Sequence, residues 1–274
     1  MTSNTASCLF HYANDINVIQ NIIVNGLYPN FCAEELTYNG TSETVGIPMV
    51  SFCDIPLKRV RDFTDRYGTY ALGFSKEWGI SNDINPIFYA ANENIVAGIR
   101  FYRNYQNSLS DELKKYGSDG KSISFPLRVG QIEGLADFIN YNNAKEANSI
   151  IWGLVKSYYG EHKGMQQCNY IESEWRYVIK EGSDIKWIWG KNEYEHWRGI
   201  GSKPAPSSAL LDRRLHFRAA DISYIIIDNE NERLNMINWI DKLSSISDGN
   251  ALFEEDKKIL ISRIISMEQI NRDF

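Results

Sequence analysis

Cysteine is scarce in this sequence, and the few cysteines present are poorly spaced for a metal site. The 274 residues include only Cys8, Cys32, Cys53 and Cys168, and no two of them form a C-x-x-C pair. Zinc sites use closely spaced cysteine or histidine ligands, whereas here only His11 follows a cysteine at short range. We therefore expect free thiols, as in a reducing compartment, and no bound metal.

Long apolar runs and a leader sequence are also missing. The chain begins with Met-Thr-Ser-Asn-Thr-Ala-Ser, which has neither the basic nor the apolar region of a signal peptide. No apolar stretch approaches the length of a membrane helix, about 20 residues. These absences predict a soluble, cytoplasmic protein with no membrane contact.

Several motifs that would assign a function are absent. The chain contains neither GxxxxGK[ST] nor GxGxxG, so a P-loop or Rossmann nucleotide site has no support. Ser51 lacks the G-x-S-x-G surroundings of a serine hydrolase. Asp54 follows an apolar run, but no second aspartate has the spacing of a metal nuclease, so a nuclease stays a minor alternative.

Positive charge is not in excess. The net charge is −6 and the pI is about 5.4, which disfavours a protein that coats nucleic acid through bulk charge. A local basic groove remains compatible with these values. A hydrophobic content of 43% with 13% aromatic residues is typical of a packed globular protein. We predict a single α+β domain over residues 1–274.

Apolar periodicity and turn residues predict a mixture of strands and helices. Strands are expected at 8–13, 47–53, 68–74, 85–90, 123–129, 170–178, 185–189 and 222–227, with 185–189 beside 170–178. Helices are expected at 16–26, 57–67, 92–116, 233–243 and 252–270. Segments 30–46, 161–167 and 192–208 are expected to be loops, and 144–159 is compatible with helix or strand. The C-terminal helices, within 233–270, fit either a peripheral docking element or part of the core.

The segment 170–178 carries the most unusual charge pattern. A strand has a period of two, so Glu172, Glu174 and Arg176 are expected on one face. Two neighbouring carboxylates repel, and an adjacent arginine partly offsets that repulsion, which is how charged sites shift pKa values. The alternative is a solvent-exposed edge strand with an ion pair across the pleat.

His11, inside the first apolar strand, has two interpretations. A lone histidine there is often a core residue with satisfied hydrogen bonds. A histidine on one strand, Ser51 on the next and a carboxylate on a later strand would instead converge on one cleft.

Several short motifs, in order, resemble the AbiGi family of phage abortive-infection proteins. They are Leu9-Phe10-His11-Tyr12, Asn25-Gly26-Leu27-Tyr28-Pro29, the run 47–57, Tyr67-Gly68, the run 73–79, Asn85-Pro86 and Glu172-x-Glu174-Trp175-Arg176-Tyr177-Val178. This family is labelled an antitoxin. The resemblance therefore implies phage defence and a cognate toxin-antitoxin partner protein.

A more distant resemblance is to ADP-ribosyltransferases, whose fold is a split β-sandwich with flanking helices and NAD in a cleft. Their signature of a His or Arg, then a Ser, Thr or Tyr, then a Glu is matched in order by His11, Ser51 and Glu174. Glu172-x-Glu174 is similar to the paired-glutamate motif of some members. Ser51 stands outside the usual Ser-Thr-Ser run.

The same resemblance implies roles for individual residues. Glu174 would hold a ribose hydroxyl and stabilise an oxocarbenium-like centre. Glu172 would orient or deprotonate the acceptor, and His11 would bind the adenosine-side ribose. The remaining NAD-binding candidates are Tyr12, Ser51, Tyr67, Tyr70 and Arg176. Tyr67 and Tyr70 are candidates for stacking on nicotinamide. Arg176 would hold the carboxylates ionised or bind pyrophosphate.

Together these features predict transfer of ADP-ribose from NAD to a macromolecule, with RNA or DNA as candidate acceptors. The alternative is a non-catalytic antitoxin on the same fold. A transferase needs Glu174 and His11 to face a common open cleft, whereas an interaction module can fill that cleft with side chains.

Overall fold

The computed structural model of the chain describes residues 7–38, 40–114, 147–162, 164–182, 184–199, 207–247, 249 and 251–273. The strand expected at 123–129 lies outside these residues.

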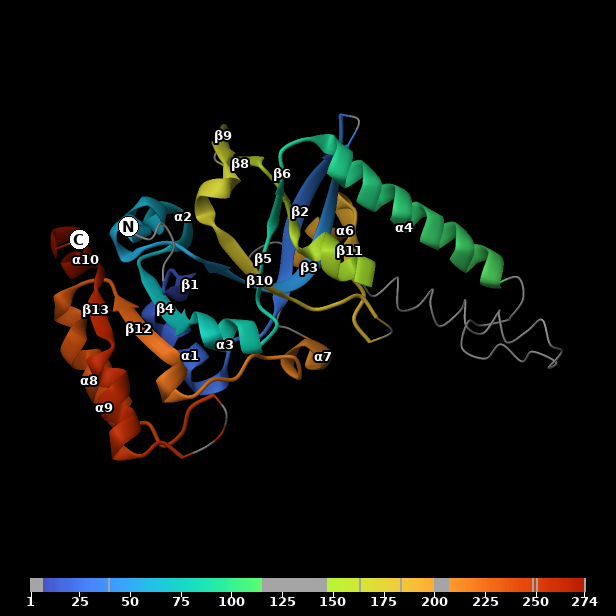
Figure 1. The fold of residues 1–274 in the computed structure, drawn as a ribbon. Coiled ribbons are helices and arrows are strands. Elements are labelled where there is room, and N and C mark those ends of the chain that lie inside the picture. The colour runs from blue at the N-terminus through green and yellow to red at the C-terminus, as the bar shows by residue number, and fades with distance from the viewer. Residues whose placement is uncertain are drawn as a thin grey trace, which may run out of the picture.

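In the described part of the chain, nine strands form one sheet (Figure 1). Its order is β13-β12-β4-β1-β3-β10-β5, and β2 and β11 also pair with β3. The pairs are antiparallel, except that β13 lies parallel to β12. The bounds are β1 Cys8–Ala13, β2 Asn30–Tyr38, β3 Thr41–Cys53, β4 Tyr70–Ser75, β5 Asn85–Pro86, β10 Glu174–Val178, β11 Ile188–Trp189, β12 Ile222–Ile227 and β13 Ile264–Ser266.

Two further strand pairs and a set of helices surround this sheet. Strand β6 (Phe88–Ala90) lies parallel to β7 (Val155–Ser157), and β8 (Tyr159–His162) forms a hairpin with β9 (Met165–Cys168). The helices are α1 Ile16–Asn25, η1 Leu57–Phe63, α2 Thr64–Tyr67, α3 Lys76–Ser81, α4 Glu93–Lys114, η2 Asn169–Glu172, α6 Lys191–Arg198, α7 Ser208–Leu211, η3 Ala219–Asp221, η4 Glu230–Glu232, α8 Arg233–Asp241, α9 Glu254–Ser262 and α10 Met267–Asp273. Residues 147–153 are also helical. The mixed content confirms the α+β class.

The two faces of the sheet bury separate cores, as alternation along β1 requires. Leu9 packs with residues of α1, α3, α8 and α9 on one face, including Ile23 and Trp78. Phe10 packs with residues of η1 and α10 on the other face, including Phe63. A third cluster covers the first half of β3, where Trp152 is almost fully buried. The second half of β3 therefore lies where these clusters meet.

The expected loop over 30–46 is wrong, because these residues form β2 and the start of β3. Glu34 and Leu36 are buried in alternate positions of β2. The turn uses Gly40 at φ 68°, a conformation that glycine adopts without strain. Polar composition concealed the hairpin, because a charged residue, Glu34, takes a core position.

Four other expectations need correction. The segment 161–167 is not a loop, since the β8–β9 hairpin spans it. Strand 185–189 reduces to β11, which pairs with β3 rather than with β10, because β5 occupies the free edge of β10. Residues 191–198 form helix α6 instead of irregular chain. The segment expected as a helix over 57–67 divides into η1 and α2.

The expected single helix over 252–270 is also wrong. It breaks into α9, the short strand β13 and α10, because Ile264 and Ile265 extend along Ile225 and Ile226 of β12. The helix expected at 233–243 is confirmed as α8. Leu260 of α9 is fully buried and Ile270 of α10 is almost so. These C-terminal elements contribute to the core, and a docking role for them stays a prediction.

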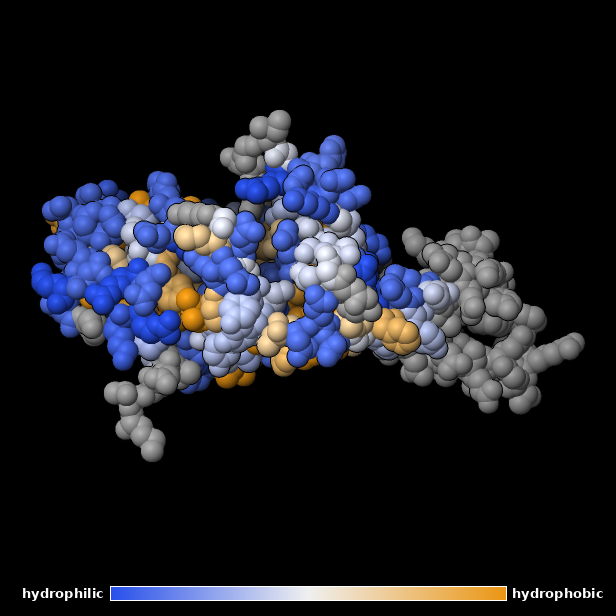
Figure 2. Space-filling model, turned by 90° about the horizontal axis from the view of Figure 1, so that it is seen from above, coloured by the Kyte–Doolittle hydropathy of each residue, from blue (hydrophilic) through white to orange (hydrophobic). Residues whose placement is uncertain are grey.

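The surface is mixed in polarity. Figure 2 shows hydrophilic residues over the end of the molecule that holds the C-terminal elements, with hydrophobic residues visible toward the middle. Helix α4 projects from the sheet (Figure 1), and its Phe101 and Tyr105 are exposed. Among the described helices, none combines the length and the apolar character that crossing a bilayer requires.

Candidate functional site

A cavity of about 230 Å³ opens where β1, β3 and β10 meet. Its lining comes from seven elements that are far apart in the sequence. The lining residues are Phe10, His11, Tyr12, Glu34, Ser51, Cys53, Tyr67, Lys156, Glu172 and Glu174. The structure therefore brings six of the eight predicted site residues together; Tyr70 and Arg176 are not among the lining residues.

His11 is held in one tautomer by the backbone of the next strand in the sheet. Its Nδ1 lies 2.9 Å from the carbonyl oxygen of Ser51. A carbonyl only accepts, so Nδ1 carries the proton and donates, which leaves Nε2 as an acceptor. Burial lowers the pKa of His11, against the opposing effect of the Ser51 hydrogen bond, so the ring is neutral near pH 7.

A second cavity, of about 280 Å³, adjoins the first on the side of α1 and β2. His11 and Ser51 line both cavities. The pairing of β3 explains this position: β2 leaves β3 at Met49, and β1 meets it at Cys53. Between these two points the edge of β3 at Ser51 is open to His11 and to both cavities.

Glu172 does not lie on the predicted strand. It ends η2, and Ser173 follows in the left-handed region at φ 45°, so the strand begins only at Glu174. The expected alternation of Glu172 with Glu174 is therefore wrong. The two carboxylates nevertheless meet, because the Lys156 ammonium lies 3.1 Å from Oε2 of Glu172 and 2.9 Å from Oε2 of Glu174.

Arg176 lies beneath this pair and is fully buried. Its guanidinium donates to both carboxylate oxygens of Glu174, at 2.7 and 3.2 Å, and to Glu34 at 2.5 Å. It also donates to the carbonyl oxygen of Gly153 at 2.9 Å. Burial by itself would raise the pKa of Glu174, but the cations of Arg176 and Lys156 outweigh it and hold that pKa at about 2. Glu174 is therefore an anion at neutral pH.

Arg66 and Tyr67, at the end of α2, complete the wall around Glu172. The Arg66 guanidinium donates to Glu172 and, at 2.6 Å, to the side chain of Gln167. The Tyr67 hydroxyl hydrogen-bonds the same glutamate, and burial is the main cause that raises the pKa of this tyrosine. Three cations, Arg66, Lys156 and Arg176, thus balance the three carboxylates of Glu34, Glu172 and Glu174.

One polar atom in the cavity lacks a partner. The hydroxyl of Tyr12 is buried and makes no hydrogen bond within the part of the chain that the structure describes. Burial raises the pKa of Tyr12, so the hydroxyl keeps its proton and is a donor. An unsatisfied buried donor costs about 1–3 kcal/mol and calls for an explanation such as a ligand.

The other candidates lie elsewhere. The Tyr70 hydroxyl donates to Glu232 at 2.8 Å, away from this cavity. Asp54, on which the nuclease alternative depends, pairs with Lys76 at 2.7 Å. The cysteines are free, and no group of three or more His, Cys, Asp or Glu side chains suits a metal among the described residues.

Sequence reasoning missed Glu34, Arg66, Lys156 and Tyr89, whose hydroxyl accepts from the Glu174 amide at 2.8 Å. The sequence does hold a signal for Glu34, because the alternation around it and the Asn39-Gly40 turn indicate a hairpin. No local signal marks Lys156 or Arg66, since their partners lie 16 and 106 residues away.

Comparison with known proteins identifies relatives of this chain. The sequence model of the family described as "Putative abortive phage resistance protein AbiGi, antitoxin" matches residues 25–228. A curated protein of Lactococcus lactis subsp. cremoris, "Abortive phage resistance protein AbiGi", is 23% identical over 237 residues, which cover 83% of this chain and 89% of that protein. No solved structure matches. The matched family region includes Ser51, Lys156 and Glu174 but begins after His11.

Proposed function

Because this chain belongs to the AbiGi family, we propose that it is an abortive-infection phage-defence protein whose central cavity transfers ADP-ribose from NAD to a macromolecular acceptor. The observation that carries the enzymatic part is the convergence of His11, Ser51 and Glu174 on one cavity. These three residues belong to three different strands, and His11 and Glu174 are 163 positions apart in the sequence. A split β-sandwich with NAD in its cleft would require this convergence.

The size of the site supports a dinucleotide. The cavities of about 230 and 280 Å³ share His11 and Ser51. Together they fall in the range of about 300–1,000 Å³ that is usual for small-molecule sites. The free Nε2 of His11 would accept a hydrogen bond from a ribose hydroxyl, and the unpartnered Tyr12 hydroxyl would donate one to the ligand.

The electrostatics suit cleavage of the nicotinamide–ribose bond. As this C–N bond breaks, its electron pair leaves with nicotinamide and positive charge develops on the ribose. The ionised Glu174, with a pKa of about 2, would stabilise that charge. The acceptor nucleophile then forms the new bond to the ribose carbon, and its proton passes to Glu172 as general base.

Lys156 constrains this mechanism. Its ammonium lies between the carboxylates of Glu172 and Glu174. Burial by itself would lower the pKa of Lys156, but the negative charges of three neighbouring glutamates outweigh burial and raise that pKa. It stays protonated at neutral pH. A positively charged nicotinamide ribose must therefore displace this ammonium from Glu174 before reaction.

The test is NAD turnover by the purified protein, with RNA, DNA and cell lysate as acceptors. We expect nicotinamide release and label transfer that fall about 100-fold or more in Glu174→Gln, since a lost electrostatic stabiliser has this effect. Glu255→Gln, an exposed substitution of the same kind on α9, serves as the control. A well-folded wild type that releases no nicotinamide and labels no acceptor would refute the transferase.

A second candidate is a non-catalytic antitoxin, which the family description supports. The observation that favours it is the closed charge balance: Glu34, Glu172 and Glu174 are each paired with a buried or half-buried cation. Such a module would bind a toxin through its surface. In cells that carry the toxin, Glu174→Gln would then protect as well as the wild type, whereas a transferase would lose its effect.

A further inference from the structure

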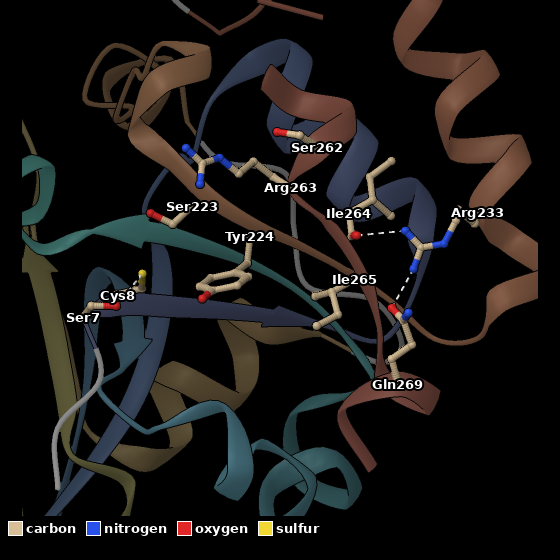
Figure 3. Close-up of a pocket in the computed structure, with 10 residues that line it drawn as sticks. All are labelled: Ser7, Cys8, Ser223, Tyr224, Arg233, Ser262, Arg263, Ile264, Ile265 and Gln269. Atoms are coloured by element: carbon tan, nitrogen blue, oxygen red, sulfur yellow. Dashed lines mark hydrogen bonds between the residues drawn. The ribbon is translucent and has the colours of Figure 1, made fainter. Parts of the chain in front are cut away.

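A separate cavity, of about 480 Å³, lies at the C-terminal end of the sheet and has no role in the proposed reaction. It is formed by the start of β1, by β12 and β13, by the end of α9 and by the first turns of α8 and α10. Figure 3 shows Ser223, Tyr224 and Ile265 around it, with Arg263 on one side and Arg233 on the other. Its volume lies within the usual range for a small-molecule site, about 300–1,000 Å³.

A bulge in β12 shapes this cavity. The register of β12 against β4 shifts between Ile222 and Tyr224, so Ser223 is the extra residue. In a regular strand Ser223 and Tyr224 would face opposite sides of the sheet. Here both line the cavity, as a bulge permits, and bulges often redirect side chains beside functional sites. Gly73 lies opposite Tyr224, and a Cβ there would come within 2.8 Å of the Phe10 ring.

The charge of the lining is positive. It contains two arginines and neither aspartate nor glutamate. Arg233 is fixed by Glu230, at 2.7 and 2.8 Å, and by hydrogen bonds to Gln269 and to the carbonyl oxygen of Ile264 (Figure 3). Arg263 has no ion-pair partner among the described residues. One uncompensated guanidinium therefore remains at the edge of the cavity.

The backbone of Arg263 is held in place even though its side chain is exposed. Its carbonyl oxygen accepts from the Ile225 amide at 2.8 Å, and its own amide donates to Leu260 at 3.1 Å. The Arg263 side chain therefore extends from a fixed backbone position, and Figure 3 shows it near Ser223 of strand β12. The hydroxyls of Ser223 and Tyr224 make no side-chain hydrogen bonds to other described residues, so both are available as donors.

We propose that this cavity binds a phosphate ester of mononucleotide size. Arg263 and the Ser223 hydroxyl hold the phosphate, because a guanidinium matches phosphate oxygens with two parallel hydrogen bonds. Tyr224 and Ile265 form the apolar wall for the base and sugar. This site is distinct from the cavity at Glu174 and does not depend on ADP-ribosyl transfer.

The experiment is isothermal titration of the full-length protein with adenosine 5′-monophosphate, and with adenosine as the ligand that lacks phosphate. We expect saturable binding of the monophosphate and none of adenosine. Arg263→Gln is expected to weaken binding roughly tenfold or more, the usual effect of losing a charged hydrogen-bond partner. Lys258→Gln removes the same charge from an exposed position on the neighbouring helix α9 and is expected to bind like the wild type.

Ser223→Ala provides a second variant, because it keeps the bulge while removing one donor. Weaker binding in Arg263→Gln and Ser223→Ala, with Lys258→Gln unchanged, supports the site. Equal losses in Arg263→Gln and Lys258→Gln would mean attraction by general surface charge and would overturn it. Wild-type protein that binds no monophosphate, or binds adenosine equally well, would overturn it also. Glu174→Gln should bind the monophosphate normally, which separates this result from the fate of the transferase.

Discussion

Arg176 is the residue with the largest share of the charge network at the centre of the molecule. It is fully buried and donates to Glu174, Glu34 and the carbonyl oxygen of Gly153. Removing one partner of a buried ion pair leaves the other charge without compensation, which costs far more than the pair contributes as a whole. Arg176 therefore supports Glu174 and helps to keep it ionised, which is one of its two expected roles, whereas its binding of pyrophosphate stays a prediction.

Arg176→Ala is accordingly expected to lower the free energy of unfolding by about 3–5 kcal/mol. Arg213→Ala is the matched control, because Arg213 pairs with Asp184 while both side chains are half exposed, and exposed pairs contribute about 0–1 kcal/mol. Denaturant unfolding of the three proteins measures both values. Similar losses in the two variants would contradict the network described here.

Glu174 makes the stability depend on pH in the acid range. Its pKa in the folded state, about 2, lies below the ordinary value of 4.5. The ionised form therefore contributes stability above about pH 4.5, and this contribution is lost as the pH falls toward 2. Glu174→Gln is expected to be less stable at pH 7 but to show a shallower decline over that window. Thermal unfolding at pH 7, 4.5 and 3 tests this, and parallel curves for the two proteins would disprove it.

At the scale of elements, the short helix α2 positions Arg66 and Tyr67 against Glu172. It ends at Gly68, whose φ is 98° and whose amide bonds the carbonyl of Thr64. A Cβ at Gly68 would lie 2.1 Å from the carbonyl oxygen of Ala13. The close contact of α2 with the end of β1 therefore requires glycine here.

Gly68→Ala is expected to destabilise the protein by at least about 1–3 kcal/mol, because strain at a positive φ adds to a backbone clash. Gly98→Ala is the control, since Gly98 lies within α4 and a Cβ there meets nothing within 4 Å. Alanine is the better helix former, so that variant should gain about 0.5–1 kcal/mol. Unfolding measurements that place both variants on the same side of the wild type would contradict this account.

At the scale of the whole molecule, the C-terminal elements complete one edge of the main sheet and pack against both of its faces. Strand β13 adds to β12 at the edge. Leu260 of α9 joins the core on one face, whereas Met267 and Ile270 of α10 join the core on the other. These elements therefore stabilise the sheet that carries the candidate site, whatever partner they contact.

Ile270→Ala should show this contribution. Ile270 is 2% exposed, and truncating a buried isoleucine to alanine costs about 2–5 kcal/mol. Ile80→Ala removes the same atoms from a side chain on α3 that is 64% exposed, and is expected to change stability by less than about 0.5 kcal/mol. If Ile270→Ala were as stable as Ile80→Ala, α10 would not belong to the folded unit.

What the sequence determined by itself was local. Apolar patterns and turn residues identified β1, α1, β4, α4, β12 and α8, because the pattern of each of these elements can be read within its own segment. The resemblance to ADP-ribosyltransferases, and not a local pattern, predicted that His11, Ser51 and Glu174 would share a cavity. Failures occurred where a core position carries charge, as at Glu34, and where β-branched residues form a strand within a helical pattern, as at Ile264.

Only the tertiary structure decided how the charges pair. Arg66 meets Glu172 across 106 positions, and Arg176 meets Glu34 across 142. Glu172 reaches Glu174 through Lys156 rather than through strand alternation, because Ser173 turns the chain into the left-handed region between them. Ion pairs depend on distances in space and on burial, neither of which has a period along the chain. The sequence therefore determined which residues could act, and the packing of distant elements decided which of them are held, neutralised or left free.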